Sequence, residues 1–149
     1  MRAVVQRVSS CRVVVEGAAT GEIGMGLLAY IGIASSDERD DADYIVNKIS
    51  GLRIFKDDHK AMNLSLEDVG GDICVVSQFT LYGDTRKGRR PSFNLAAPPE
   101  IAIPLYEYCI NAFISRGFMT ASGRFGAHMN VDYVNDGPVT ILVDSQKIF

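Results

Sequence analysis

The sequence has few cysteines and histidines, and they are not spaced for a disulfide framework or a metal site. Cys11, Cys74 and Cys109 are far apart, odd in number and without a CxxC pair, which indicates reduced, intracellular thiols. His59 and His128 have no cysteine at metal-ligand spacing, so each is more simply explained as a surface or hydrogen-bonded residue. We therefore expect no bound metal.

The sequence also lacks a long apolar run and an excess of basic charge. No apolar run approaches the roughly 20 residues that span a bilayer, and the N-terminal stretch MRAVVQRVSS has no signal-peptide core. We therefore expect a soluble cytoplasmic protein that contacts no membrane. The formal net charge is -3, whereas a protein that wraps duplex nucleic acid is usually strongly basic. Any nucleic acid would be held locally, at a patch or at an end.

Common catalytic and nucleotide-binding motifs are missing as well. Residues 21–26, GEIGMG, contain three glycines but not in the order GxGxxG, and no Walker lysine follows them. No GxSxG nucleophile elbow occurs. We therefore expect no nucleotide cofactor and no other cofactor.

The pattern of apolar residues predicts an α/β protein with one domain, residues 1–149. The chain has 149 residues, of which 47% are hydrophobic, so it is long enough to bury a core. Helical periodicity predicts helices over residues 37–50, with a capping box formed by Ser35 and Glu38, and over 99–117. Strands are predicted at residues 3–8, 12–15, 27–34 and 72–81, with two more on either side of residues 135–138. This content predicts mixed β-sheets in layers, with two main helices on one face and a second sheet on the other, a three-layer α/β/β arrangement.

The stretch SQFTL, Ser77 to Leu81, is the first candidate site. Its hydroxyl groups, on Ser77 and Thr80, stand where a strand ends and backbone N–H groups become available. One interpretation is a strand end capped by hydroxyls, and the other is a nucleophile or an oxyanion site. A nucleophilic Thr80 would need a base to take its proton. No histidine is near in sequence, so the pattern argues against a triad hydrolase.

The stretch RKGRR is the second candidate, with four cations in five residues: Arg86, Lys87, Arg89 and Arg90. A charge run is commonly a solvated face. In a chain of net negative charge, a concentrated basic loop beside a strand end also suits phosphate groups. It would position a phosphodiester chain without reading its base sequence.

The third candidate is the tetrapeptide NDGP, residues 135–138, which runs directly into an apolar strand. Each of its four residue types favours a turn for a different reason, and an ordinary turn does not need all four. Glycine lets the main chain approach a ligand closely, and an X–Pro bond can be held cis at a cost of about 0.5–1 kcal/mol. The stretch is either a hairpin corner or a backbone surface presented to a ligand.

Three segments together resemble one family. MRAVVQRVSSCRVVVEG at the start, SQFTLYGDTRKGRRPSF in the middle and GRFGAHMNVDYVNDGPVTILVDS at the end are similar to D-aminoacyl-tRNA deacylases of the D-tyrosyl-tRNA deacylase type. The likeness covers essentially the whole chain. It implies an enzyme that hydrolyses the ester between a D-amino acid, or glycine, and the 3′-terminal adenosine of tRNA. It also implies a homodimer in which a cis Gly-Pro turn of each subunit enters the pocket of the other and excludes L-amino acids sterically.

The resemblance implies roles for individual residues. Gly137 and Pro138 would direct their carbonyl groups at the substrate's amino group, and Arg7 would hold their turn in place. The reaction centre would be lined by Ser77, Gln78, Phe79 and Thr80, and the adenosine pocket by Met129 and Ala102. The tRNA phosphates would meet Arg86, Lys87, Arg89 and Arg90. The substrate's own 2′-hydroxyl would assist the attacking water, so that Thr80 is not an obligatory nucleophile.

Three other functions fit the same residues. The first is an esterase that forms a covalent acyl-enzyme on Thr80 or Ser77. The second is a non-catalytic module that binds the acceptor end of tRNA without turnover, and the third is a purely structural dimer. A hydrolysis assay and a search for a trapped acyl-enzyme separate them.

Overall fold

The computed structural model describes residues 1–148. They contain six strands, two α-helices and one short 3-10 helix, joined by loops. In chain order the elements are β1 (Arg2–Val15), β2 (Ala18–Ile23), β3 (Gly26–Gly32), α1 (Arg39–Ser50), β4 (Asp72–Ser77), η1 (Phe79–Tyr82), α2 (Pro99–Ser115), β5 (Thr120–Ser122) and β6 (Asn130–Asp144). The mixed sheet and the two helices predicted from the sequence are confirmed.

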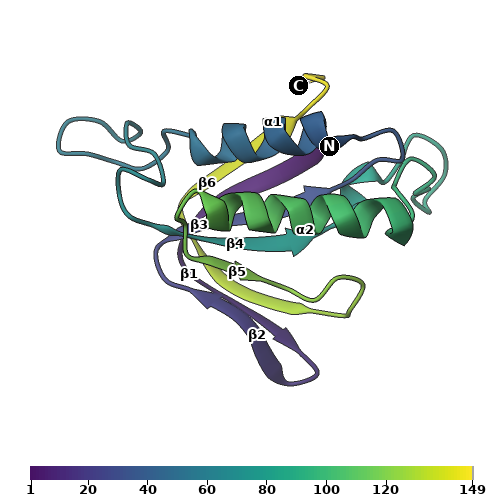
Figure 1. The fold of residues 1–149 in the computed structure, drawn as a ribbon, viewed down its shortest axis with the longest axis horizontal. Helices are drawn as coiled ribbons and strands as arrows, with labels where there is room; N and C mark the ends of the chain where they lie inside the picture. Colours follow the sequence, from purple (N-terminus) through teal and green to yellow (C-terminus); the bar gives the residue numbers. More distant parts are fainter. Residues whose placement is uncertain (149) are drawn as a thin grey trace.

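All six strands belong to one sheet, and β1 is the strand that most of the others share. One edge of β1 pairs antiparallel with β3 and then β2, and its other edge pairs antiparallel with β6 along nearly its whole length. From β3 the sheet continues through parallel pairs to β4 and β5. The sheet curls until β2 contacts β5, which gives it a barrel-like lower half (Figure 1). The second layer expected from the sequence is therefore the curled part of the same sheet, not a separate sheet.

Both helices cover one face of the sheet, and the main core lies between them and the strands (Figure 1). Ile45 and Ile49 of α1 and Phe113 of α2 are completely buried there. A smaller apolar cluster fills the inside of the curl; it is made of Val8, Cys11, Val13, Ile23, Leu28, Cys74 and Val76. All three cysteines are buried free thiols. Within residues 1–148, neither helix combines the length and the apolarity that crossing a membrane requires.

Two pairs of predicted strands are single long strands in the structure. β1 runs through residues 9–11, where the sequence indicated a break, and β6 runs through residues 135–138, where it indicated a hairpin corner. In both places the register between β1 and β6 shifts, so the turn-forming residues produce bulges instead of chain reversals. At each bulge the opposite strand runs on, and the pairing of β1 with β6 therefore resumes.

The start of α1 and the end of β4 also differ from the prediction. α1 begins at Arg39, and its first turn is capped by the Asp41 carboxylate, which accepts the Glu38 N–H at 2.9 Å. The predicted pair of Ser35 and Glu38 does not form this box, because residues 34–37 make a turn closed by the buried Asp37, which accepts the Ala34 N–H at 2.6 Å. β4 ends at Ser77, and the next residues coil into η1 instead of extending the strand.

Candidate active site

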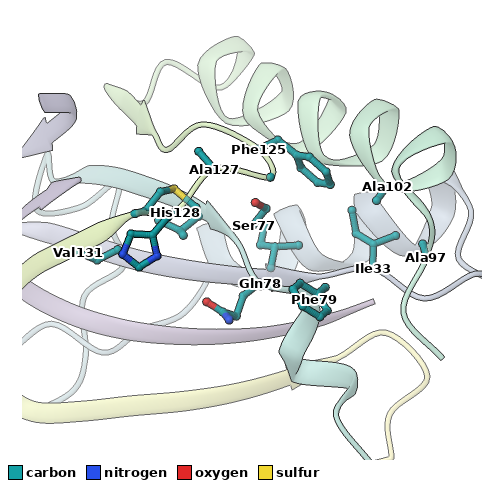
Figure 2. Close-up of a pocket in the computed structure, with 14 residues that line it drawn as sticks. Ile33, Ser77, Gln78, Phe79, Ala97, Ala102, Phe125, Ala127, His128 and Val131 are labelled. Carbon is teal, nitrogen blue, oxygen red and sulfur yellow. The ribbon is translucent and has the colours of Figure 1, made fainter. Parts of the chain in front are cut away.

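A cavity of about 250 Å³ lies where the parallel strands β3 and β4 end. Parallel strands bring their carboxyl ends to one edge of a sheet, and ligands commonly bind outside that edge. In Figure 2, Ala102 lies on α2 and Phe125 lies beneath this helix, Phe79 and Ala97 stand at one end of the cavity, and His128 and Val131 stand at the other. The lining is mainly apolar, with a few polar groups at the strand end.

The structure brings five of the predicted site residues together around this cavity. They come from β4, η1, α2 and the segment before β6, and they are Ser77, Gln78, Phe79, Ala102 and Met129. Gln78 is held beside β3 by its backbone N–H, which donates to the Ile31 carbonyl at 2.8 Å. The Leu81 N–H donates to the Gln78 carbonyl at 3.2 Å, and this hydrogen bond is the first of η1. The N–H groups of Phe79 and Thr80 precede this first bond of η1, as the N–H groups of an opening helical turn do.

Thr80 is exposed and stands directly after these lining residues. Its hydroxyl oxygen accepts a short hydrogen bond from the Gln78 side-chain amide. An amide donor withdraws electron density from the oxygen and cannot take a proton from it. This contact therefore orients the Thr80 hydroxyl but does not activate it as a nucleophile.

Apart from Met129, the sequence did not single out site residues in the segment 123–129, which closes the far side of the cavity. Gly123 N–H donates to the Val75 carbonyl at 3.2 Å, and the ring of Phe125 packs against Tyr106 of α2 with the ring centroids 5.8 Å apart. The Tyr106 hydroxyl donates to the same Val75 carbonyl at 2.8 Å. His128 lines the cavity from this segment. The sequence feature that could have indicated this segment is the small residues of GRFGAHM, because a chain with small side chains can run close to the edge of a sheet.

Gly137 and Pro138 do not line this cavity; they stand on an outward bulge of β6. Between the pairs Val8–Asn135 and Gln6–Thr140, β6 advances five residues while β1 advances two, so the residues between are pushed out of the sheet. Both Gly137 and Pro138 are exposed, and the peptide bond between them is cis. The predicted hairpin corner is thus a bulge that presents its backbone to the outside.

Side chains on both strands hold this bulge. Arg7 of β1 donates from Nε to the Asp136 carbonyl at 3.1 Å and from Nη1 to the Ile54 carbonyl at 2.5 Å. Arg7 Nε also lies 3.1 Å from the Asp136 carboxylate. At the base of the bulge, the Asn135 side chain accepts the Val139 N–H at 3.2 Å and donates to the Thr140 hydroxyl at 3.3 Å. Hydrogen bonds between residues of the motif NDGPVT therefore close the bulge at its base.

The predicted basic loop is closed at its base by backbone hydrogen bonds between Asp84 and Ser92, of 2.7 and 3.0 Å. Arg86 is held by Asp84, with 2.7 Å between its Nη2 and the carboxylate, and this hydrogen bonding lowers the pKa of Asp84 to about 2. Lys87, Arg89 and Arg90 are exposed on the rest of the loop. Within residues 1–148, no group of three His, Cys, Asp or Glu side chains is arranged to hold a metal ion.

Comparison with known proteins gives the same family over nearly the whole chain. The sequence model of the family described as D-Tyr-tRNA(Tyr) deacylase matches residues 4–144. The chain is 57% identical to a D-aminoacyl-tRNA deacylase of Desulfatibacillum aliphaticivorans over 146 residues, which covers 98% of this chain and 100% of the relative. It is 54% identical over 149 residues to the deacylase of Clostridioides difficile strain 630, which covers 100% of both chains.

Solved structures share the fold. One, described as c-Myc DNA Unwinding Element Binding Protein, is 37% identical and superposes with a TM-score of 0.89, covering 97% of this chain and 98% of that one. Another, described as a "probable eukaryotic D-amino acid tRNA deacylase", is 21% identical and superposes with a TM-score of 0.82 over 96% and 98% of the two chains. The chain belongs to the D-aminoacyl-tRNA deacylase family, a family of ester hydrolases, and the resemblance found in the sequence is confirmed.

The buried phenol of Tyr106 provides a test of how the cavity wall is held. Burial raises the pKa of Tyr106 above its ordinary value of 10.0. As the pH rises past that value, the unfolded chain releases this proton while the folded chain keeps it, so the free energy of unfolding falls. We expect Tyr106→Phe to cost about 1 kcal/mol near neutral pH, where the hydrogen bond is lost.

We also expect the Tyr106→Phe variant to lose less stability than the wild type as the pH rises. Urea denaturation at about pH 8 and about pH 10.5 measures both effects. The other tyrosines are present in both proteins, so the difference between the two pH dependences reports on Tyr106 alone. An identical pH dependence in the two proteins would show that its phenol titrates as freely as in the unfolded chain.

Proposed function

We propose that this chain hydrolyses the ester bond of D-aminoacyl-tRNA and of mischarged glycyl-tRNA in the cytoplasm, and that it rejects L-aminoacyl esters. The observation that carries the proposal is the outward bulge of β6, which fixes two main-chain carbonyl groups away from the cavity of its own chain. Such a surface has a use only if it meets a ligand or a second subunit. The family to which the chain belongs supplies the class of substrate.

The cavity suits the terminal adenosine of the tRNA. Ala102, Phe125 and Met129 give it an apolar wall that can cover the faces of a purine, and the polar strand end lies at one side. With the base against this wall, the ester would lie beside Ser77, Gln78, Phe79 and Thr80. This orientation would place the aminoacyl group at the open side of the cavity, next to η1.

The chemistry then needs position and electrostatics more than a protein nucleophile. Water adds to the ester carbonyl, negative charge develops on the carbonyl oxygen, and the N–H groups of Phe79 and Thr80 would stabilise that charge. The bond between the carbonyl carbon and the 3′-oxygen then breaks, and the 3′-oxygen takes up a proton as it leaves. The neighbouring 2′-hydroxyl would orient the water and relay the proton. The amide contact on the Thr80 hydroxyl supports this route over a covalent acyl-enzyme.

Selection by handedness would come from the bulge of the partner subunit. The carbonyl groups of Gly137 and Pro138 would accept hydrogen bonds from the substrate's ammonium group. With the ammonium group fixed there, a D-residue directs its side chain away from the turn, whereas an L-residue would drive its Cβ into the turn's backbone. Glycine has no Cβ and would pass. The specificity is thus a steric rejection of the wrong enantiomer.

The surface around the bulge supports a homodimer with two shared sites. β6 exposes apolar side chains on both sides of the bulge, namely Tyr133, Val134 and Leu142. A two-fold contact between two copies of this surface would cover them and would carry each bulge toward the other subunit. The exposed cations Lys87, Arg89 and Arg90, joined by Arg86, would contact the tRNA phosphates at the outer edge of each site.

The role of the bulge in selection is tested with D-Tyr-tRNA and L-Tyr-tRNA. We expect the wild type to cleave the D-ester and to leave the L-ester intact. Gly137→Ala should lower kcat/KM for the D-ester by about a hundredfold, because a misplaced positioning group is costly. The reason is local: Gly137 has φ +129°, and an added Cβ would lie 2.8 Å from Val139 Cγ2 and 2.9 Å from Arg7 Nη2.

Gly17→Ala is the matched control for this variant. Gly17 also has positive φ, +81°, but it lies in the turn between β1 and β2 with nothing within 4 Å of an added Cβ. It introduces the same kind of backbone strain far from the bulge and should retain wild-type kcat/KM. Equal losses in the two variants, or cleavage of the L-ester by the wild type, would contradict the proposed selection.

Subunit mixing tests whether the bulge serves the neighbouring subunit. Gly137→Ala damages the bulge, and Ala102→Phe would fill the cavity; each variant alone should be nearly inactive. A mixed dimer would combine one intact cavity with one intact bulge in a single site. After random exchange of subunits we expect about a quarter of wild-type activity. A mixture no more active than the separate variants would mean that each bulge serves its own chain.

Thr80→Val tests the chemical step. We expect the variant to retain activity within about tenfold of the wild type, because the hydroxyl orients but does not attack. A substrate whose terminal adenosine lacks the 2′-hydroxyl should instead be cleaved at least about a hundredfold more slowly, the usual scale of acid–base assistance. Complete loss of activity in a folded Thr80→Val variant, or a trapped acyl-enzyme, would favour the covalent esterase. No turnover of any ester by the wild type would favour a binding module.

A further inference from the structure

Two aromatic rings stand in contact beside the cavity, and both are open to solvent. The centroids of Phe79 and Phe93 are 5.0 Å apart in an edge-to-face arrangement with 71° between the ring planes. Phe79 is 56% exposed and Phe93 is 36% exposed. A single exposed aromatic residue is common in proteins. A pair of aromatic rings in contact at the rim of a cavity offers a surface on which a flat, apolar ligand can pack.

The pair is held rigidly from two sides. Next to η1, Gly83 N–H donates to the Thr80 carbonyl at 2.9 Å, and a Cβ on Gly83 would lie only 3.1 Å from the Phe93 ring, so glycine permits this close approach. On the other side, Ala96 N–H donates to the Phe93 carbonyl at 3.0 Å, and Ala97 N–H donates to the Ile33 carbonyl at 2.8 Å. Phe79 and Ala97 both line the cavity, where Figure 2 shows them at the same end.

The same segment carries the basic loop. Phe93 directly follows Ser92, whose backbone hydrogen bonds to Asp84 close that loop. The exposed cations Lys87, Arg89 and Arg90 therefore lie on a loop anchored one residue away from the ring of Phe93. Aromatic rings beside exposed cations are the arrangement with which proteins bind single-stranded nucleic acid, because rings stack on bases and cations meet phosphates.

We propose that Phe79 and Phe93 form a stacking platform for the base of the penultimate nucleotide of the tRNA acceptor strand, with the adjacent phosphate held by the basic loop. This inference rests on the proposed function, in which the terminal adenosine occupies the cavity. An RNA chain leaving the cavity at its Phe79 end would pass over the ring pair and then meet the loop. In the proposed dimer the partner's bulge would meet the aminoacyl group beside η1, while the ring of Phe93 and the basic loop would stay open to the RNA, because pairing two copies of this loop would bring like charges together.

The platform is tested by comparing two esters, D-Tyr-tRNA and 3′-O-D-tyrosyl-adenosine, which lacks the penultimate nucleotide. Phe93→Leu keeps apolar bulk but removes the ring. It should lower kcat/KM for the tRNA ester, relative to the adenosine ester, by roughly tenfold, the scale of one lost base stack. Phe93→Tyr should preserve the wild-type ratio. Leu95→Ala, which truncates an exposed apolar side chain of the same segment, is the matched control and should also preserve it.

A second measurement reports the stack directly and needs no turnover. A short acceptor-strand RNA carrying 2-aminopurine at the penultimate position should lose fluorescence on binding to the wild type and to Phe93→Tyr, but not on binding to Phe93→Leu. Unchanged fluorescence with the wild type would overturn the platform, as would equal losses on both esters in Phe93→Leu. A change in sedimentation of Phe93→Leu without a change in the fluorescence response would assign the rings to a contact between subunits instead. If the wild type binds the RNA with quenching but cleaves neither ester, the proposed function fails and the platform stands.

Discussion

The side chain of Arg7 is only 12% exposed, and a charge on so nearly buried a side chain must be matched by partners. It finds them in the carbonyl groups of Ile54 and Asp136 and in the Asp136 carboxylate. Arg7 stands on β1 between Gln6 and Val8, the two residues whose pairing with β6 brackets the bulge. The displayed turn is thereby fixed to the centre of the sheet. A bulge held in this way keeps its shape without a ligand, which a recognition surface made of main-chain atoms requires.

The cavity and the bulge are built by different parts of one sheet. The cavity depends on the parallel pair β3–β4, whose ends meet beneath α2, while the bulge depends on the antiparallel pair β1–β6. Within a single chain, neither Gly137 nor Pro138 of the bulge lines the cavity. In the proposed dimer, the first part would hold the nucleotide and the second would examine the amino acid. Recognition of the nucleotide and of the amino acid would then both rest on rigid backbone and would require little side-chain chemistry. This agrees with the absence of the usual catalytic sets from the sequence.

The sequence predicted the helices and the buried strands because their periodicity reports burial directly, as in Gly26–Gly32, where nearly every side chain is buried. It did not predict that β1 and β6 continue past SSC and NDGP, because turn-forming residues look alike in a corner and in a bulge. The pairing strand decides between the two, and it lies more than a hundred residues away in the sequence. Similarly, the residues FTL favour a strand by type but form η1, because the hydrogen bonding of β4 to β3 ends at Gln78. Phe125 and His128 reach the cavity through the contacts of Gly123 and Tyr106, which residue type alone does not reveal.

The pairing of β1 with β6 joins the first and the last of the described strands, since Arg2 and Asp144 are partners although 142 positions separate them. During translation β1 leaves the ribosome before the other described strands of the sheet, and its partner β6 leaves after them. The nascent chain therefore carries a valine-rich strand with one unpaired edge until β6 has been made. Closure of the sheet is a late, long-range event, of the kind that slows folding and exposes an emerging polypeptide to aggregation. The last β-strand thus completes the sheet and also ends the period in which the new protein is vulnerable.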